Sequence, residues 1–219
     1  MLANVYLHYV LDTWFEQEVQ PRLKGKAYLI RYADDFVIGF TEESDARRVM
    51  EVLPKRFGKY GLKVHPDKTR LVRFNKPTDR NDGDSGQPES FDLLGFTHYW
   101  GRGRKGNPVV KRKTSSKRLS RALRAINEWC RSHRHRPLAE QQNTLGQKIR
   151  GHCAYYGITG NSQCLQEFRM WATRLWHKWL NRRNRERPMT WSIFNRLLAR
   201  YPLPAAVAIH SVCRIAANP

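Results

Sequence analysis

The spacing of apolar and polar side chains predicts a helix, a β-hairpin and a second helix in the first part of the chain. Apolar residues recur at helical spacing from Leu2 to about Glu18. From Ala27 to Phe40, aromatic and β-branched residues flank Ala33-Asp34-Asp35, which predicts a hairpin with two carboxylates at its tip. The next helix is expected to have Thr41 as its N-cap and to end at Gly61, with Pro54 interrupting or kinking it. The apolar faces are expected to contain Val5, Tyr9, Leu11 and Phe15 in the first helix, and Ala46, Val49, Met50, Leu53 and Phe57 in the second.

The middle of the chain has the pattern of short strands and loops. Residues 62–65 and 69–74 are predicted as strands around the turn at Pro66-Asp67-Lys68. The polar stretch 75–90 is rich in Asp, Gly, Asn and Pro and is predicted as a loop. Residues 91–100 and 108–113 are expected to pair as a second hairpin, with a basic tip between them.

Helical spacing returns after Thr114-Ser115-Ser116, which can provide an N-cap, and continues toward the end of the chain. Four helices are expected, beginning near Ser116, Leu138, Ser162 and Trp191. Trp176 and Trp179 share their helix faces with leucines and are expected in the core. The fold class is therefore predicted as α+β, with an α+β domain at 1–113 and an all-helical domain at 114–219.

The charge narrows the class of partner. Forty Lys and Arg oppose 19 Asp and Glu, which gives a formal net charge of +21 and a pI near 10.4. The positive electrostatic field of such a charge excess attracts polyanions. Ribosomal proteins and proteins that bind acidic membranes share this property. No apolar run reaches the ~20 residues of a membrane-spanning helix. The four cysteines lack the C-x-x-C spacing of zinc sites, so reduced thiols and a cytoplasmic location are expected.

Paired carboxylates at a hairpin tip can serve metal-dependent chemistry. Polymerases join nucleotides with two metal ions, and Mg²⁺ prefers oxygen ligands. The alternative for Asp34-Asp35 is an ordinary turn, because aspartate favours turns through its own hydrogen bonds to the backbone. The residue pair alone strongly favours the ordinary turn.

Motifs elsewhere in the chain favour the first interpretation. Tyr32-Ala33-Asp34-Asp35 resembles the catalytic hairpin of reverse transcriptases. The segments 2–12, 61–69 and 93–96 are similar to the neighbouring motifs of group II intron enzymes, in the same order. After Lys113, Arg150-Gly151-His152-Cys153-Ala154-Tyr155-Tyr156-Gly157 and Met189-Thr190-Trp191 resemble the thumb and maturase region of that family. The resemblance implies a partial right-hand polymerase palm of antiparallel hairpins and helices, followed by an all-helical thumb/maturase domain.

The resemblance also implies roles for individual residues. Asp34 and Asp35 would be catalytic metal ligands for Mg²⁺. Lys68 would lie near the departing pyrophosphate, although a solvated turn lysine is an equal alternative. Leu94, Gly95 and Phe96 would form the primer grip, with a packed strand glycine as the alternative for Gly95.

A complete family member has fingers and the first half of the palm ahead of these motifs, with a further metal-binding aspartate. We therefore expect no polymerisation by this chain alone, unless a missing amino-terminal half acts in trans. The DNA-binding segment and endonuclease with paired cysteines that some members carry have no counterpart here, so no DNA cleavage is expected.

Structured RNA, in particular a group II intron, and an RNA/DNA template-primer are the partners that the resemblance implies, and no membrane partner is expected. Phosphate contacts supply affinity that is largely independent of sequence, and tyrosines can stack on unpaired bases. The alternatives are a non-catalytic RNA-binding maturase-like module and an inactive remnant of a mobile element. The expected RNA-binding residues are Arg102, Arg104, Lys105, Lys111, Arg112, Lys113, Lys117, Arg118, Arg121, Arg124, Tyr155, Tyr156, Arg182 and Arg183.

Overall fold

The computed structural model describes residues 2–77, 89–183 and 188–210 and has the predicted α+β fold. The chain forms two compact units. The amino-terminal unit comprises Met1–Leu94 and Arg102–Pro108, and the helical unit comprises Gly95–Gly101 and Val109–Pro219. None of the described helices is long and apolar enough to cross a membrane. Whether the functional domains divide at residue 113 stays a prediction.

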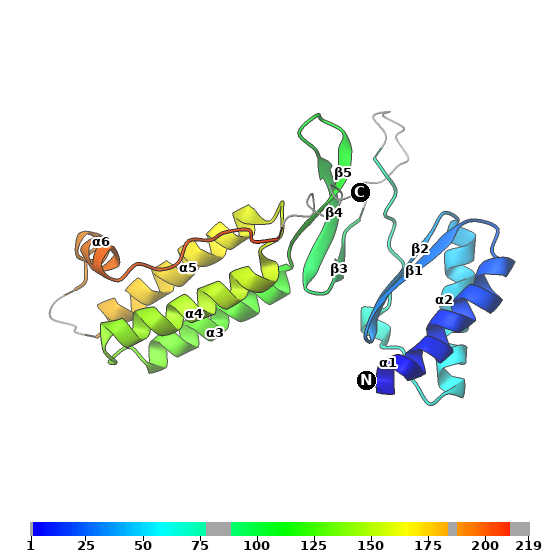
Figure 1. Ribbon diagram of the computed structural model, residues 1–219, viewed down its shortest axis with the longest axis horizontal. Coiled ribbons are helices and arrows are strands. Elements are labelled where there is room, and N and C mark those ends of the chain that lie inside the picture. The colour runs from blue at the N-terminus through cyan, green and yellow to red at the C-terminus, as the bar shows by residue number, and fades with distance from the viewer. Residues whose placement is uncertain (1, 78–88, 184–187, 211–219) are drawn as a thin grey trace. The chain divides into compact units, whose positions relative to one another are not determined.

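The first helical stretch is longer and less regular than predicted. It continues to Arg22 (Figure 1), and its turns change from α to π to 3₁₀ geometry. Val10, Leu11, Trp14 and Phe15 are buried, whereas Val5 and Tyr9 are 57% and 66% exposed, contrary to the expected face. The wider π-helical turns rotate successive residues differently, so a regular helical period assigns these faces wrongly. The segments are α1 (Leu2–Leu7), η1 (His8–Thr13), η2 (Phe15–Val19) and η3 (Gln20–Arg22).

The predicted carboxylate hairpin is present. Strands β1 (Ala27–Tyr32) and β2 (Asp35–Phe40) pair antiparallel, with Ala27 opposite Phe40 and Tyr32 opposite Asp35. One face of the hairpin packs with helix α2 (Glu43–Lys59) and the first helical stretch around a shared core. The other face leaves alternate β1 side chains exposed. The buried residues of this core are Val10, Leu11, Trp14, Phe15, Ala27, Leu53 and Phe57.

Helix α2 differs from the prediction at its start and in its middle. Glu42 is the N-cap residue, and the Thr41 hydroxyl instead accepts the Lys26 backbone N–H at 2.9 Å. The helix runs without a break through Pro54, and Met50 is 39% exposed rather than part of the core face. Gly61 ends the helix as predicted, because its positive φ of 68° allows the Leu62 N–H to reach the Phe57 carbonyl at 3.0 Å.

The strands predicted at 62–65 and 69–74 are absent. The one regular element of this part is a 3₁₀ turn, η4 (Pro66–Lys68), and the flanking described residues have no assigned secondary structure. A β pattern in the sequence forms a strand only where another strand is available to pair with it. Of the predicted loop at 75–90, residues 78–88 lie outside the described part of the chain.

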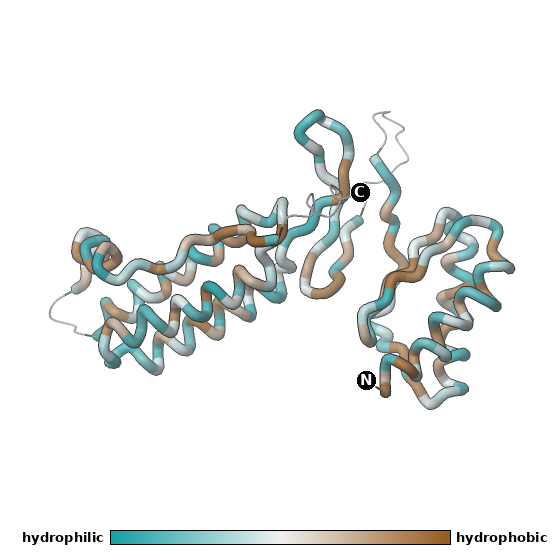
Figure 2. The backbone as a smooth tube through the Cα atoms, viewed as in Figure 1, coloured by the Kyte–Doolittle hydropathy of each residue, from teal (hydrophilic) through white to brown (hydrophobic). Residues whose placement is uncertain are grey.

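The second predicted hairpin is instead a sheet of three strands in the order β3-β4-β5. These are β3 (Phe91–Leu93), β4 (Phe96–Arg102) and β5 (Pro108–Thr114). The predicted strand 91–100 is broken because Leu94 and Gly95 have φ angles of 52° and 80°. Positive φ at both central residues is the signature of a tight type I′ turn. Figure 2 shows the hydrophilic character of the turn that joins β4 to β5.

The helical unit contains the four predicted helices, three of them long (Figure 1). Its core includes Trp176, which is fully buried, and Trp179 packs partly buried against it, as predicted. A buried amide orders this core, because Gln141 accepts the Trp176 indole N–H at 2.9 Å and donates to the Arg136 carbonyl at 2.7 Å. The helices are α3 (Ser116–Ser132), α4 (Leu138–Tyr156), α5 (Ser162–Asn181) and α6 (Trp191–Arg200).

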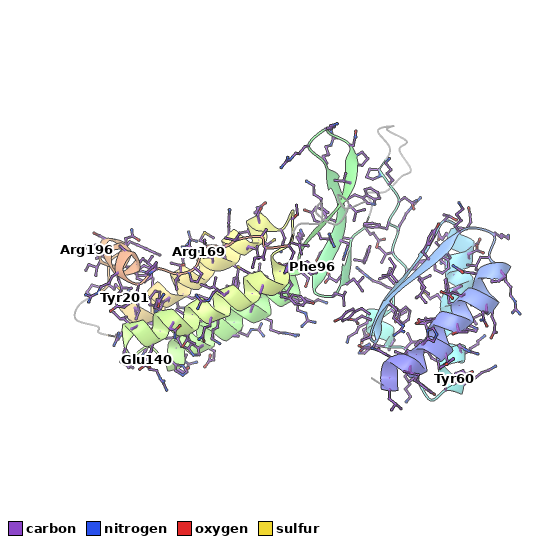
Figure 3. All side chains as sticks on the ribbon, viewed as in Figure 1. Tyr60, Phe96, Glu140, Arg169, Arg196 and Tyr201 are labelled. Carbon is purple, nitrogen blue, oxygen red and sulfur yellow. The ribbon has the colours of Figure 1, made fainter. Side chains whose placement is uncertain are left out.

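After α6 the chain returns along α4 and α5 in an extended form, and much of this segment is hydrophobic in Figure 2. Arg169, labelled in Figure 3, donates to the Pro204 carbonyl at 2.7 Å, and Gln142 donates to the Pro202 carbonyl at 2.8 Å. At the far end, the His210 N–H bonds the Gly157 carbonyl at 2.8 Å. These contacts fix residues 202–210 against the helices.

Candidate functional site

The hairpin tip presents the two predicted metal ligands to solvent. Ala33 and Asp34 form the turn, and Asp35 is the first residue of β2, opposite Tyr32. Asp34 and Asp35 are both exposed, and no hydrogen bond or ion pair from the described residues reaches their carboxylates. Their oxygen atoms are therefore available to an external ligand.

Arg31 supports this tip from within β1. Its guanidinium binds both carboxylate oxygens of Asp12, through Nε at 2.7 Å and Nη2 at 2.6 Å, and its Nη1 donates to the Ala33 carbonyl at 2.9 Å. The hydrogen bond from Arg31 holds the pKa of Asp12 below its usual value, with a smaller contribution from His8. The same bond raises the pKa of Arg31. Both groups are consequently charged at neutral pH.

The donors at the tip fit a hard divalent cation in kind. Mg²⁺ is commonly held by one or two carboxylates, with water and substrate phosphates as the other ligands. Asp34 and Asp35 provide such oxygens in an exposed position. In the described part of the chain, no group of three or more His, Cys, Asp or Glu side chains is placed to hold a metal ion. The described residues can therefore contribute two carboxylates, with the remaining ligands coming from elsewhere.

Lys68 is the last residue of the 3₁₀ turn η4, and its side chain is exposed. Its backbone N–H bonds the His65 carbonyl at 3.2 Å, which fixes the turn. Within the described residues no ion pair joins Lys68 to Asp34 or Asp35. Its predicted role near a departing pyrophosphate stays a prediction.

A second candidate site lies in the helical unit, where two predicted sets of residues meet. Phe96 of the expected primer grip (labelled in Figure 3) lies 6.1 Å from the Tyr155 ring in a stacked arrangement and 5.3 Å from the Tyr156 ring, centroid to centroid. Gly95 also lies against Tyr156, since a Cβ atom at this position would be 2.9 Å from the Tyr156 hydroxyl. The Tyr155 side chain is 57% exposed, so one ring of this aromatic cluster faces solvent.

Two arginines of α3 lie beside this aromatic cluster. Burial raises the pKa of the Tyr156 phenol, and the positive charges of Arg118 and Arg121 partly oppose that shift. The Arg118 Cγ atom would lie 3.5 Å from a Cβ at Gly95. Both arginines are exposed, as are Lys117 and Arg124 on the same helix. We call Phe96, Tyr155, Tyr156, Arg118 and Arg121 the basic aromatic cluster.

The other predicted RNA-binding residues lie outside this cluster. Arg182 stacks over the Trp179 ring at 4.9 Å, and Arg183 donates to the His135 carbonyl at 3.3 Å, at the opposite end of α5 from Tyr156. Lys113 lies 5.1 Å from the Tyr99 ring centroid, and the Lys111 side chain packs against Gly101. Arg112 is half-buried, whereas Arg102, Arg104 and Lys105 are exposed at the β4–β5 turn.

Sequence reasoning missed the residues that support these sites. Asp12 and Arg31 were not assigned a role, although a charged residue in the middle of an apolar strand is a signal for a paired partner. Asn161 accepts the Thr114 N–H at 2.9 Å and donates to the Thr114 hydroxyl at 2.8 Å, joining the end of β5 to α5. His152 was noted only within a motif, and it stacks on Phe168 with ring centroids 3.7 Å apart.

Two family models match parts of the chain. Residues 1–98 match the family model described as reverse transcriptase (RNA-dependent DNA polymerase). Residues 119–198 match the model described as group II intron, maturase-specific domain. The first match contains the carboxylate hairpin and the second begins within α3. No curated protein matches the chain.

Proposed function

We propose, because this chain belongs to the group II intron reverse transcriptase/maturase family, that its basic aromatic cluster binds structured intron RNA. The observation that carries the proposal is the placement of Arg118 and Arg121 near Tyr156, whose ring contacts the exposed ring of Tyr155. Guanidinium groups bind phosphates, and an exposed tyrosine ring can stack on an unpaired base. Both properties favour RNA binding, and the cluster combines them on one surface.

The exposed face of α3 extends the proposed surface. Lys117, Arg121 and Arg124 follow each other at spacings of four and three residues, which places them along one side of the helix. Each basic side chain that binds a phosphate releases counterions from the RNA. The affinity for RNA therefore falls as the salt concentration rises. The surface is therefore expected to contribute affinity with little dependence on base sequence.

Fluorescence anisotropy with a labelled, folded intron RNA over a range of KCl concentrations tests this proposal. The variant Lys117→Gln/Arg121→Gln/Arg124→Gln should bind more weakly and reduce the slope of log affinity against log salt by roughly 2. The matched control Arg48→Gln/Lys55→Gln/Lys59→Gln removes equal charge from exposed positions of α2. Equal loss of affinity in both variants would mean that the net charge, and not this surface, binds the RNA.

We propose as a second function that the hairpin tip binds Mg²⁺ for nucleotidyl transfer, which the exposure of Asp34 and Asp35 supports. When bound, the ion would activate the attacking hydroxyl and neutralise charge on the phosphates. The two carboxylates would position the ion at the end of the hairpin, and the primer-grip role of Leu94, Gly95 and Phe96 stays a prediction. Lys68 would stabilise the negative charge of the departing pyrophosphate.

Primer extension on an RNA template with Mg²⁺ tests the second function. Asp34→Ala should abolish any extension that the parent protein shows, because the carboxylate that holds the ion is lost. Asp67→Ala is the control, since Asp67 is an exposed aspartate of the same unit. If the parent protein extends the primer, undiminished extension by Asp34→Ala would exclude Asp34 as a ligand of the catalytic ion.

A further inference from the structure

The Arg31 guanidinium divides its donors between two targets. Its Nε and Nη2 form one edge, which binds the two oxygens of Asp12, and its Nη1 points to the Ala33 carbonyl. The Arg31 and Asp12 side chains are only 15% and 21% exposed, so water screens this pair less than it screens a surface pair. Arg31 therefore makes a directed connection from Asp12 to the backbone of the turn.

The backbone of Asp12, whose carboxylate binds one edge of the Arg31 guanidinium, is held in place by packing. It lies in the π-helical segment η1, between the buried residues Leu11 and Trp14. These neighbours belong to the core of the amino-terminal unit, so the backbone that carries Asp12 is held by packing. The core thus holds the backbone of Asp12, and the exposed His8 side chain also contacts the Asp12 carboxylate at 3.3 Å.

The Ala33-Asp34 turn, to which Arg31 donates a hydrogen bond, has an unfavourable backbone conformation. Ala33 has a φ of 54°, in the left-handed region that residues with a Cβ atom rarely adopt. Such a conformation persists only where the surroundings impose it. The Arg31 bond to the Ala33 carbonyl acts on this residue, and the next residue in the chain is Asp34. A change at Ala33 would therefore change the direction in which the Asp34 carboxylate projects.

We propose that Asp12 and Arg31 are positioning residues that hold the Ala33 carbonyl and thereby aim the Asp34 carboxylate at a divalent cation. The proposal rests on the proposed metal-binding function of the hairpin tip. An ion pair that only stabilises the fold would connect η1 to β1 equally well without the third bond to the turn. The planar, forked donors of arginine are required for both targets, and a lysine ammonium cannot present two parallel N–H groups to a carboxylate.

The test uses the 219-residue chain labelled with ¹⁵N, and Mn²⁺ as the probe. Paramagnetic broadening of the Asp34, Asp35 and Phe36 amide signals gives the affinity of the tip for the ion, and the HN–Hα coupling of Ala33 reports its φ. Arg31→Lys should weaken Mn²⁺ binding by about 10-fold or more and change the Ala33 coupling, because groups that orient a metal ligand typically affect affinity by about 10- to 100-fold. Asp12→Asn, which keeps one acceptor oxygen, should show the same effects more weakly.

Arg47→Lys is the matched control, because Arg47 forms an exposed pair with Glu43 on α2 away from the tip. It should leave Mn²⁺ affinity and the Ala33 coupling at their parental values. A folded Arg31→Lys or Asp12→Asn protein with parental affinity and coupling would overturn the positioning proposal. If the parent protein shows no broadening that Asp34→Asn removes, the metal-binding function itself is wrong and the positioning proposal is overturned with it.

Discussion

Asn161 and Thr114 form a reciprocal pair of hydrogen bonds that fixes the end of β5 to the start of α5. The Thr114 N–H donates to Asn161 Oδ1 at 2.9 Å, and Asn161 Nδ2 donates to the Thr114 hydroxyl at 2.8 Å. The second Nδ2 hydrogen is used by the Tyr156 carbonyl, also at 2.8 Å. Both side chains are almost fully buried, so water cannot replace these bonds.

Asn161→Ala should therefore destabilise the helical unit by roughly 2–4 kcal/mol, because it leaves buried donors and acceptors without partners. Urea unfolding followed by circular dichroism measures the loss in the free energy of unfolding. The control Gln163→Ala removes an exposed amide that bonds Glu167 on the same helix. It should change the free energy by less than about 0.5 kcal/mol, and an equal effect of both variants would contradict the role of the buried pair.

Gly95→Ala should destabilise the protein more than replacement of a glycine at which backbone strain is the only cost. Its φ of 80° disfavours any side chain, by about 1–2 kcal/mol. The added Cβ would also lie 2.9 Å from the Tyr156 hydroxyl, and the resulting overpacking costs about 1–3 kcal/mol more.

Gly160→Ala separates the backbone strain from the overpacking. Gly160 has a φ of 92°, but a Cβ atom added there would have no atom within 4 Å. Thermal unfolding of both variants should give the larger decrease in Tm for Gly95→Ala. Equal decreases would show that Tyr156 moves away from the new methyl group without a penalty.

Tyr155→Ala should weaken binding of intron RNA by about 1–3 kcal/mol, which is the effect of removing one stacked base contact. Tyr155→Phe keeps the ring and should retain most of the affinity. Tyr9→Ala serves as the control, since it removes another exposed tyrosine ring, 66% exposed, from the amino-terminal unit. Filter binding at constant salt measures all three, and parental affinity of Tyr155→Ala would exclude stacking on this ring.

His152 should make the stability of the helical unit depend on pH in the acidic range. Burial lowers its pKa from 6.5 to about 4. The unfolded chain therefore binds a proton at this imidazole between these two values, whereas the folded chain does not. The free energy of unfolding should consequently fall as the pH decreases from about 6.5 to about 4, with no contribution from this group above that range.

His152→Phe tests this dependence, because phenylalanine can keep the stacking on Phe168 but cannot titrate. Unfolding measured from pH 4 to pH 7.5 should show a smaller slope for the variant than for the parent. An unchanged slope in His152→Phe would assign the pH dependence to other groups.

Local patterns in the sequence predicted the elements that depend on local interactions. The carboxylate hairpin and the helices of the helical unit follow from periods of 2 and 3.6 residues, and the structure contains them. The predictions failed where the backbone departs from these periods. Leu94 is an example, since its left-handed conformation turns the predicted strand 91–100 into two strands. Thr41 is another, because a distant N–H group occupies the hydroxyl that was expected to cap α2.

The sequence by itself determined the class of fold, the basic character of the surface and the motifs that identify the family, because composition and short-range order carry this information. Only the tertiary structure decided which side chains act together. Asp12 reaches Arg31 across 19 positions, and Asn161 reaches Thr114 across 47. Phe96 likewise meets Tyr155 and Tyr156 only in the folded helical unit. Such contacts depend on how elements pack, and no period along the chain specifies the partner that packing brings into reach.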